Sequence, residues 1–434
     1  MGQTNVLLIG SGGREHTLAW KISQSGLLKN LYIAPGNPGT SSCGQNVDLD
    51  TDDFDEVTEF VRQNEIDLVV VGPEKPLVDG MADHLEDREI SVFGPRKAAA
   101  LLEGSKDFAK SFMREYNIPT AEYQSFNSGD FDKAFSYIKN RNRFPIVLKA
   151  DGLAGGKGVF ICQDEEEVES RLNQFREDRT LQDAADKLII EEFMEGEEVS
   201  VFIISDGFTA KVLHNAQDHK RIGEGDTGLN TGGMGAYCPA PVMTPELMER
   251  VEKEIVLPTI TGMQLNDTPY KGILYLGLMI TEQGPKVVEY NCRFGDPECQ
   301  AILPSLKNDL LQLMLTVQDQ KLDEIEIELD NLYRCCVVMA SGGYPVSYEK
   351  GKVISGLDSI DDNALIFHAG TEDKNGEIVT SGGRVLSVVG SGATLREAIY
   401  HTYKNIEYLS FEKSYYRTDI GAKGLYRLNE NDVG

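Results

Sequence analysis

The sequence lacks the segments that would place a protein in or across a membrane. Its 434 residues contain no run of about 18 apolar residues, the length that a membrane-spanning helix needs. The N-terminus has no basic region, no long apolar stretch and no cleavage site, so it does not look like a secretion signal. We therefore expect a cytoplasmic protein that does not bind membranes.

Paired cysteines are also missing. The chain has seven cysteines, an odd and scattered set, and no C-x-x-C pair or Cys/His cluster has zinc spacing. This pattern favours reduced thiols in the cytoplasm over disulfides or a zinc site. Cys335 and Cys336 are adjacent inside an apolar run, which predicts a buried strand more than redox chemistry.

Positive charge is scarce. Lys and Arg number 42 against 70 Asp and Glu, which gives a net charge of −28. Such a field repels nucleic acids and anionic membranes, so we expect neither as a partner. A ligand rich in phosphate must then be held by a local cluster of Lys and Arg. The length is enough for about three domains at ~150 residues each.

The first hundred residues alternate apolar strands, loops and helices. Strands are expected at 6–9, 31–34 and 67–71, and a glycine-containing loop follows each. In a parallel sheet these loops converge at the carboxyl edge, where ligands bind. The loop at 10–13 precedes a helix N-terminus, an arrangement that favours phosphate. The dinucleotide fingerprint G-x-G-x-x-G is incomplete, and each loop alone could be an ordinary turn.

A lysine- and glycine-rich loop follows the strand expected at 146–149. Four glycines surround Lys157 within residues 152–158, which lets backbone N–H groups approach phosphate oxygens. The loop has no G-K-[ST] ending, so it is not a Walker A loop. Lys149 and Lys157 supply part of the required positive cluster, although a flexible hairpin is an alternative.

Two further segments offer ligand contacts. After the strand at 188–190, the acidic run 191–198 could present backbone groups to an adenine edge and a carboxylate to ribose hydroxyls; the alternative is a solvated acidic turn. The Gly- and Thr-rich stretch 226–235 is long for a simple connection, which favours a functional loop. Lys220 and Arg221 precede it, and His219 is either a base or, more commonly, a structural hydrogen-bonding group.

The first half of the stretch Lys286 to Glu298 is expected to be a strand with three polar side chains on one face. Alternation places Glu289, Asn291 and Arg293 together and Val288, Tyr290 and Cys292 on the buried side. Carboxylate and amide oxygens suit Mg²⁺, and a guanidinium suits a planar anion. The alternative is the polar face of an edge strand. The expected neighbouring strand, 277–281, offers no second carboxylate.

These segments predict an α/β and α+β multidomain protein. We expect an N-terminal parallel-sheet domain at 1–105, a central two-lobed domain at 106–328 with a flexible lid lobe at about 122–194, and a C-terminal α+β lobe at 329–434. No chemistry stands out in the C-terminal lobe, so packing against the site is its expected role.

Taken together, the chain resembles the phosphoribosylamine–glycine ligases, or glycinamide ribonucleotide synthetases, of the ATP-grasp superfamily. The resemblance covers essentially the whole length. The motifs that carry it are G-x-G-G-R-E-H at 10–16, A-P-G-N-x-G at 34–39, V-G-P-E at 71–74, E-G-S-K at 103–106, K-A-D-G-L-A-x-G-K-G-V at 149–159, Q-D-H-K-R at 217–221, N-T-G-G-M-G-A-Y at 230–237 and R-F-G-D-P-E at 293–298.

The resemblance implies a fold and a reaction. The fold would be a pre-ATP-grasp domain, an ATP-grasp domain with a mobile lid and a C-terminal domain. Glycine would attack the γ-phosphate of ATP to give glycyl phosphate, and the amine of 5-phosphoribosylamine would displace phosphate. Such chemistry needs charge neutralisation around the phosphoryl group more than a general base. It would act in purine biosynthesis as a stand-alone monomer, with at most weak self-association.

Matching positions also imply site residues. ATP would be held by Lys106, Lys149, Lys157, Gly155, Gly156, Glu191, Glu192, Phe193 and Glu198. Glycine and phosphoribosylamine would be bound by Gly12, Gly13, Asn37, Gly72, Glu74, Asp218, Lys220 and Arg293. Catalysis would fall to Arg293, Asp218 and Lys157, and Mg²⁺ or Mn²⁺ to Glu289 and Asn291.

Three departures from the family pattern change loops and leave the implied phosphate and metal ligands in place. Gly155 stands where Ala is usual, Leu229 replaces a usual Pro, and the segment before Leu188 lacks a Gly-rich turn. Other interpretations are a carboxylase-like or D-alanine-ligase-like ATP-grasp enzyme, a non-catalytic ATP-binding regulator and, least supported, a Rossmann oxidoreductase.

Overall fold

The N-terminal part is a parallel sheet covered by helices. The structure, a computed structural model, describes residues 3–127, 129–152, 158–177 and 187–431. The strand order is β3-β2-β1-β4-β5, and every pairing is parallel. The elements are β1 (Thr4–Gly10), α1 (Gly13–Ile22), β2 (Leu28–Pro35), β3 (Gln45–Asn46), α2 (Phe54–Gln63), β4 (Leu68–Val71), α3 (Glu74–Asp79), α4 (Met81–Glu86), β5 (Val92–Phe93) and α5 (Lys97–Gly104). The predicted parallel sheet is confirmed.

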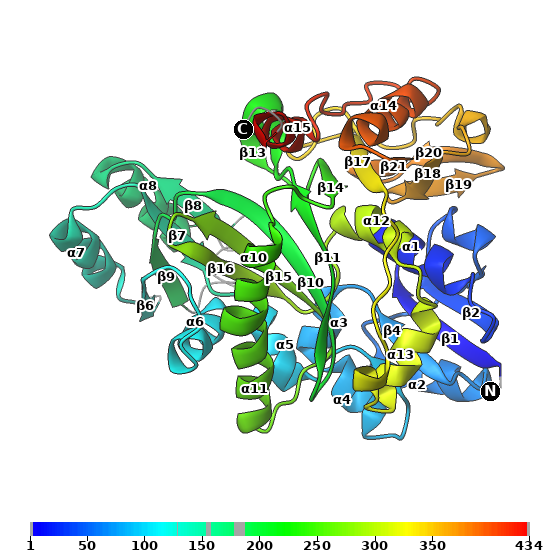
Figure 1. The fold of residues 1–434 in the computed structure, drawn as a ribbon, viewed down its shortest axis with the longest axis horizontal. Coiled ribbons are helices and arrows are strands. Elements are labelled where there is room, and N and C mark those ends of the chain that lie inside the picture. The colour runs from blue at the N-terminus through cyan, green and yellow to red at the C-terminus, as the bar shows by residue number, and fades with distance from the viewer. Residues whose placement is uncertain (1–2, 128, 153–157, 178–186, 432–434) are drawn as a thin grey trace.

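Helix α6 (Lys106–Glu115) leads into a small lobe that projects from the body (Figure 1). This lid lobe is an antiparallel sheet in the order β6-β9-β7-β8, and its described residues include two helices. Its elements are β6 (Tyr123–Asn127), α7 (Phe131–Arg141), β7 (Ile146–Ala150), β8 (Val159–Cys162), α8 (Glu165–Glu177) and β9 (Lys187–Glu192). Ile138, Leu148 and Phe175 are among the buried residues of a core that belongs to this lobe alone.

An eight-stranded sheet forms the body, in the order β16-β15-β10-β11-β14-β17-β21-β18. Its strands are β10 (Glu197–Asp206), β11 (Ala210–Asp218), β14 (Gly235–Cys238), β15 (Lys271–Thr281), β16 (Gly284–Asn291), β17 (Tyr333–Ala340), β18 (Ala364–His368) and β21 (Arg384–Gly392). The last three belong to the C-terminal part and join the sheet where β14 pairs with β17, Gly235 facing Val337. The C-terminal α+β lobe therefore continues the central sheet.

Two hairpins and several helices complete this body. They are β12 (Arg221–Gly223) with β13 (Thr227–Asn230), β19 (Thr371–Lys374) with β20 (Glu377–Thr380), α10 (Pro245–Val251), α11 (Leu257–Leu265), α12 (Glu298–Ile302), α13 (Leu310–Gln318), α14 (Leu395–Ile406) and α15 (Ala422–Asn431). A π-helical turn, Glu252–Val256, joins α10 to α11. Pro258 follows that turn, and a proline inside a helix lacks the N–H for a regular bond.

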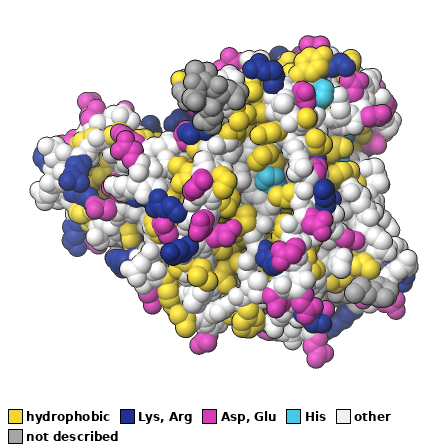
Figure 2. Space-filling view, in the orientation of Figure 1, with side chains coloured by type: hydrophobic (Ala, Val, Ile, Leu, Met, Phe, Trp, Pro, Cys, Tyr) yellow, Lys and Arg dark blue, Asp and Glu magenta, His cyan; other side chains and the backbone are white. Residues whose placement is uncertain are grey.

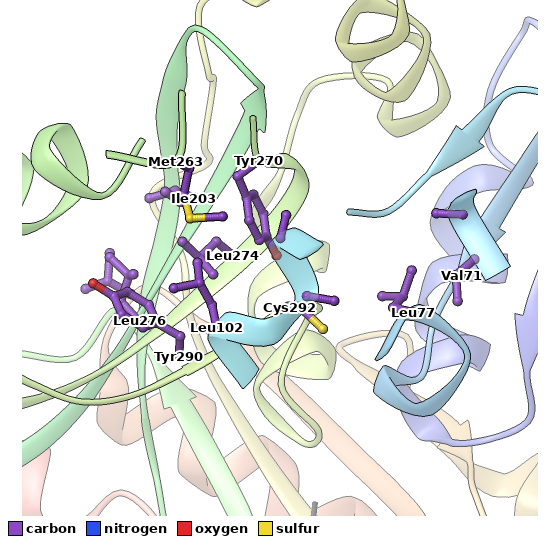
Figure 3. Packing of buried hydrophobic residues seen from close by; sticks show 14 of the residues in the cluster. Val71, Leu77, Leu102, Ile203, Met263, Tyr270, Leu274, Leu276, Tyr290 and Cys292 are labelled. Carbon is purple, nitrogen blue, oxygen red and sulfur yellow. The ribbon is translucent and has the colours of Figure 1, made fainter. Parts of the chain in front are cut away.

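The N-terminal sheet and the central sheet share two hydrophobic clusters. Figure 3 shows Val71, Leu77 and Leu102 from the N-terminal part together with Tyr270 and Cys292 from the central part, all members of one buried cluster. This packing joins the N-terminal part to the central part. Within the described ranges no helix is long and apolar enough to cross a membrane.

The strand β16 departs from simple alternation. Its register with β15 shifts between the Gly277–Glu289 pair and the Leu278–Val287 pair, which leaves Val288 as an extra residue. Such a bulge re-aims side chains next to a site. Val287 is therefore the fully buried residue, and Val288, which we expected on the buried face, lines the cleft. Tyr290 and Cys292 are buried as predicted.

The seven cysteines are all free. Cys335 and Cys336 are fully buried in β17, which confirms their expected place in a strand core. Burial raises the pKa of both thiols, so neither is poised to react.

Candidate functional site

A cleft of about 1450 Å³ lies where the N-terminal part, the lid lobe, the central sheet and the C-terminal part meet. Single-ligand pockets usually measure about 300–1,000 Å³, so this cleft has room for more than one small molecule. Lysines and arginines enter it from all four parts, Lys149 from the lid lobe and Arg384 from the C-terminal part among them. On the face seen in Figure 2, acidic and basic side chains are interspersed.

One end of the cleft contains a buried carboxylate between two lysines. Glu191 Oε2 lies 3.0 Å from Lys149 Nζ and 3.0 Å from Lys110 Nζ, and Lys110 also donates to Thr120 Oγ1 at 2.8 Å. Burial works to raise the pKa of Glu191, but Lys149 and Lys110 lower it overall. Burial lowers the pKa of Lys110 to about 8. The structure thus pairs Lys149 with Glu191, two residues that we expected to contact different parts of ATP, and adds Lys110, which we did not foresee.

Lys106 lies at the N-terminus of α6, where the lid lobe meets the helix. Its Nζ donates to the carbonyls of Asp151 and Gly152 at 3.4 and 3.0 Å. The Asp151 carboxylate in turn accepts from the Asp107 backbone N–H at 2.8 Å and from Ser105 Oγ at 3.0 Å. Lys106 therefore faces the same cleft as Lys149, and burial lowers its pKa. Lys157, Gly155 and Gly156 lie outside the described residues.

The segment after β9 turns along the cleft wall. Phe193 lines the cleft with 37% of its surface exposed, an accessible apolar face for a flat ring. Glu198 lines it too and pairs with Lys220, Oε2 to Nζ 2.9 Å. Glu192 points elsewhere: its carboxylate accepts from Glu122 N at 3.1 Å and lies 3.9 Å from Lys286 Nζ. The structure brings Phe193 and Glu198 to the cleft, whereas the Glu192 side chain is directed away from it.

Glu289 and Asn291, the expected metal ligands, both line the cleft. Burial works to raise the pKa of Glu289, but Lys220, Lys149 and Lys106 outweigh it and lower that pKa to about 2. Its Oε1 lies 3.5 Å from Lys220 Nζ. The neighbouring strand places Gly277 opposite Glu289. Among the described residues, no three His, Cys, Asp or Glu side chains form a metal-binding group.

Arg293 sits between two carboxylates. Its Nε lies 3.1 Å from Glu74 Oε2 and its Nη2 2.8 Å from Glu103 Oε1. Burial works to raise the pKa of Glu74, but Arg293 and Arg14 lower it to about 2. Glu74 and Arg293, which we expected to bind different substrates, therefore pair in the cleft, and Glu103 is an additional partner on α5.

Asp218 and Lys220, at the end of β11 and just beyond it, also face the cleft. Burial, and then the nearby Glu298, raises the pKa of Asp218 well above its usual value. Lys220 is held charged by Glu198 and Glu289, although burial opposes this, and its pKa is raised. His219 between them is buried, and burial lowers its pKa to about 4. A structural role fits His219 better than that of a base.

The N-terminal loops contribute less than expected. Gly12, Gly13, Asn37 and Gly72 are not among the residues that line the cleft. Glu15 reaches back over α1, and its Oε2 accepts from Gly12 N at 2.7 Å, so a carboxylate of the chain occupies the helix N-terminus.

The Asn37 side chain forms hydrogen bonds with backbone groups of the protein. Its amide donates to the carbonyls of Ser11 and His368 at 2.8 and 3.0 Å, and its Oδ1 accepts from Gly39 N and Thr40 N. It thereby ties the N-terminal part to the C-terminal part. The assignment of these loop residues to substrate stays a prediction.

Arg384 is the main residue that sequence reasoning missed. It begins β21, lines the cleft and pairs with Asp296, Nη2 to Oδ2 3.3 Å. Its position depends on β17 and β21 joining the central sheet, a pairing that no local pattern indicates. The two glycines before it mark a turn and nothing more.

Comparisons with known proteins agree along the whole chain. Family models match as the phosphoribosylglycinamide synthetase N domain over residues 4–103, the ATP-grasp (A) domain over 104–299 and the C domain over 334–423. A phosphoribosylamine–glycine ligase of Rhodopirellula baltica is 48% identical over 433 residues, covering 98% of this chain and 99% of that protein. A bifunctional purine biosynthetic protein of Pichia angusta is 45% identical, covering 100% of this chain and 55% of that protein.

Solved structures show the same architecture. The crystal structure of a phosphoribosylamine–glycine ligase from Thermotoga maritima superimposes with a TM-score of 0.83 at 33% identity, covering 96% of this chain and 100% of that one. The biotin carboxylase domain of a Hydrogenobacter thermophilus 2-oxoglutarate carboxylase has a TM-score of 0.75 at 14% identity, covering 98% and 99%. At that identity the second likeness concerns the fold alone.

Proposed function

Because the chain belongs to the phosphoribosylglycinamide synthetase family, we propose that its cleft joins glycine to 5-phosphoribosylamine through a glycyl phosphate intermediate. The enzyme is an ATP-grasp ligase of purine biosynthesis, and its substrates are glycine, phosphoribosylamine and ATP. The observation that carries the proposal is one cleft that holds Lys106, Lys149, Glu289 and Arg293 together. In a chain of net charge −28, Lys106, Lys149 and Arg293 supply the local positive charge that a phosphate-rich ligand requires.

The nucleotide half of the cleft lies between the lid lobe and the central sheet. Lys149 and Lys106 hold the phosphates there, Phe193 covers the adenine and Glu198 accepts from the ribose. Glu191 keeps Lys149 in place. We also assign Lys157, Gly155 and Gly156 to this nucleotide half, on the basis of their positions in the sequence. The lid lobe, residues 122–194, has its own core, so it can move over the nucleotide as a unit.

The residues present fit a divalent metal with oxygen ligands. Glu289 is ionised because its pKa is about 2, and Asn291 offers a neutral amide oxygen beside it. We propose Mg²⁺, or Mn²⁺, on these two side chains, with the remaining ligands from phosphates and water. When bound, the metal supplies charge neutralisation to the phosphates. The absence of a second carboxylate on β15 makes the site depend on nucleotide.

At the other half of the cleft Arg293 and Asp218 position the substrates that react. One carboxylate oxygen of glycine forms a bond to the γ-phosphorus as the bond to ADP breaks, which gives glycyl phosphate. The amine of phosphoribosylamine then attacks the acyl carbon, phosphate leaves, and the nitrogen loses a proton. Arg293 faces the acyl phosphate, and Glu74 and Glu103 hold its guanidinium in one orientation.

We further propose three units: residues 1–105 for phosphoribosylamine, 106–328 for ATP and glycine, and 329–434 as a wall of the site. The enzyme acts as a monomer in the cytoplasm, where its seven free thiols remain reduced. Light scattering of the purified protein tests whether it is a monomer in solution.

The deciding assay measures ADP release while glycine, phosphoribosylamine and Mg²⁺ are omitted in turn. We expect turnover only when all three accompany ATP, with glycinamide ribonucleotide formed in equal amount to ADP. ADP release that requires another amino acid or bicarbonate would instead favour a different ATP-grasp carboxylate–amine ligase. Glu282→Gln, an exposed carboxylate change, is the matched control for Glu289→Gln, which should lose Mg²⁺-dependent turnover.

A further inference from the structure

Arg384 connects three segments that meet at the cleft. Its Nη1 donates to the carbonyl of Gly232 at 2.7 Å and to the carbonyl of Asp296 at 2.6 Å, and its Nη2 lies 3.3 Å from Asp296 Oδ2. A third carbonyl, that of Gly233, lies 3.5 Å from Nη1. The planar fork of a guanidinium is suited to several acceptors at fixed angles. A residue of the C-terminal part therefore binds both the glycine-rich loop and the R-F-G-D-P-E segment.

The same loop is held from its other side. The backbone N–H of Gly232 donates to Tyr344 Oη at 3.1 Å, so the N–H and the carbonyl of Gly232 are both bound by the C-terminal part. Two residues further along the chain, the backbone N–H of Met234 donates to the carbonyl of His219 at 2.9 Å. These hydrogen bonds hold the glycine-rich loop in one conformation.

The loop in turn packs against Asp218. Gly233 has a φ of +112°, and a Cβ placed there would lie 2.9 Å from Asp218 Oδ1 and 3.3 Å from Asp296 O. Only a glycine allows this close approach at that φ. A shift of the loop would therefore open space beside the Asp218 carboxylate, whose Oδ1 also accepts from His219 N at 2.6 Å.

Arg384 is bound by three backbone carbonyls and one carboxylate of the protein. Its charge is balanced by Asp296, whose carboxylate also accepts from Gln300 Nε2 at 2.7 Å. Its guanidinium thereby fixes the Gly232–Gly233 loop and the Asp296 segment relative to each other.

We propose that Arg384 is a positioning residue for the amino-acid substrate, because it holds Gly232 and Gly233 against Asp218 and so keeps that carboxylate oriented toward glycine. The inference rests on the proposed function, in which Asp218 orients glycine. It assigns to the C-terminal part a share in glycine binding that its sequence does not suggest. ATP binding, which depends on Lys149 and Lys106 at the other end, should not depend on Arg384.

The test compares the KM for glycine with the Kd for MgATP in Arg384→Ala, Arg384→Lys and Tyr344→Phe. We expect the glycine KM of Arg384→Ala to rise about tenfold or more, the size of a lost charge-assisted hydrogen bond, while the MgATP Kd stays within about twofold. Lys keeps the charge but not the fork, so its effect should be intermediate. Tyr344→Phe should raise the glycine KM by a smaller factor. Added guanidinium ion should partly restore the glycine KM of Arg384→Ala only.

Arg396→Ala, an exposed change on α14, is the control and should match the wild type. If Arg384→Ala fails to fold, Arg384→Lys and Tyr344→Phe still carry the test. An unchanged glycine KM in the folded variants would overturn the inference, and so would a loss of MgATP affinity equal to the loss for glycine. A wild-type enzyme without glycine-dependent ADP release would refute the proposed function instead.

Discussion

Glu191→Gln should loosen the lid lobe, because it removes the only carboxylate that the structure pairs with Lys149 and Lys110 in the described part of the chain. Both Nζ atoms lie 3.0 Å from Glu191 Oε2, and the side chains of Lys110, Lys149 and Glu191 are 3%, 8% and 2% exposed. The amide of Gln keeps a hydrogen-bond acceptor and loses the charge. Removing one partner of a buried ion pair costs about 3–5 kcal/mol.

That cost should appear in the strands that carry the pair. At about 1.4 kcal/mol per factor of ten, protection of the β7 and β9 amides against hydrogen exchange should fall by about a hundredfold to several thousandfold. Hydrogen exchange measured at individual amides suits a multidomain chain, because a single unfolding free energy is poorly defined for such a chain. The loss should shrink at high pH, because without Glu191 the pKa of Lys110 falls further and the lysine sheds its proton.

Glu192→Gln is the matched control on the neighbouring residue. Its carboxylate is 33% exposed and 3.9 Å from Lys286, so its loss should change protection little, since exposed pairs contribute about 0–1 kcal/mol. Equal protection in Glu191→Gln and Glu192→Gln would refute the reasoning that the buried triad holds the lid lobe together.

Three further results are expected. Lys110→Met should remove a pH dependence of stability. Burial lowers the Lys110 pKa from 10.5 to about 8, so the folded protein loses this proton at a lower pH than the unfolded chain does. Between those two pKa values the free energy of unfolding of the wild type should rise by up to about 1.4 kcal/mol per pH unit. Urea midpoints that stay parallel in the two proteins over this range would contradict it. Asn37→Ala should lower the melting temperature, since four hydrogen bonds are lost, and leave the glycine KM nearly unchanged; a large change in that KM with intact stability would restore Asn37 as a substrate ligand. Thiol titration without reductant should find seven thiols in denaturant and, in the native protein, fast reaction at Cys43 alone; fewer than seven would reveal a disulfide.

Local patterns in the sequence predicted much of the fold. Apolar runs such as Val6–Ile9 were found as buried parallel strands because both faces of that sheet are covered, so the run needs no alternation. The polar face of β16 was predicted from alternation, yet the bulge at Val288 was not, because a bulge is decided by the register with β15. The capping of α1 by Glu15 did have a local signal, the spacing Gly12-x-x-Glu15, which we read as a phosphate site instead.

Contacts between distant segments account for most of what the sequence could not show. Lys149 and Glu191 are 42 residues apart, and Arg384 is 152 residues from Gly232. The scarcity of Lys and Arg indicated that a local cluster of positive side chains must exist, and it is found around Lys106, Lys149 and Lys220. It could not indicate that carboxylates would accompany Lys149 and Lys220, or that Lys106 would donate to two backbone carbonyls. That pairing follows from burial, since a buried cation without a partner is costly.

The reaction path is tested most directly with glycine labelled with ¹⁸O in both carboxylate oxygens. With phosphoribosylamine and ATP present, we expect one labelled oxygen in each phosphate released, because the carboxylate oxygen that attacks the γ-phosphorus leaves with it. The other labelled oxygen should remain in the amide of the product. Unlabelled phosphate, formed with the same yield of product, would contradict a glycyl phosphate intermediate.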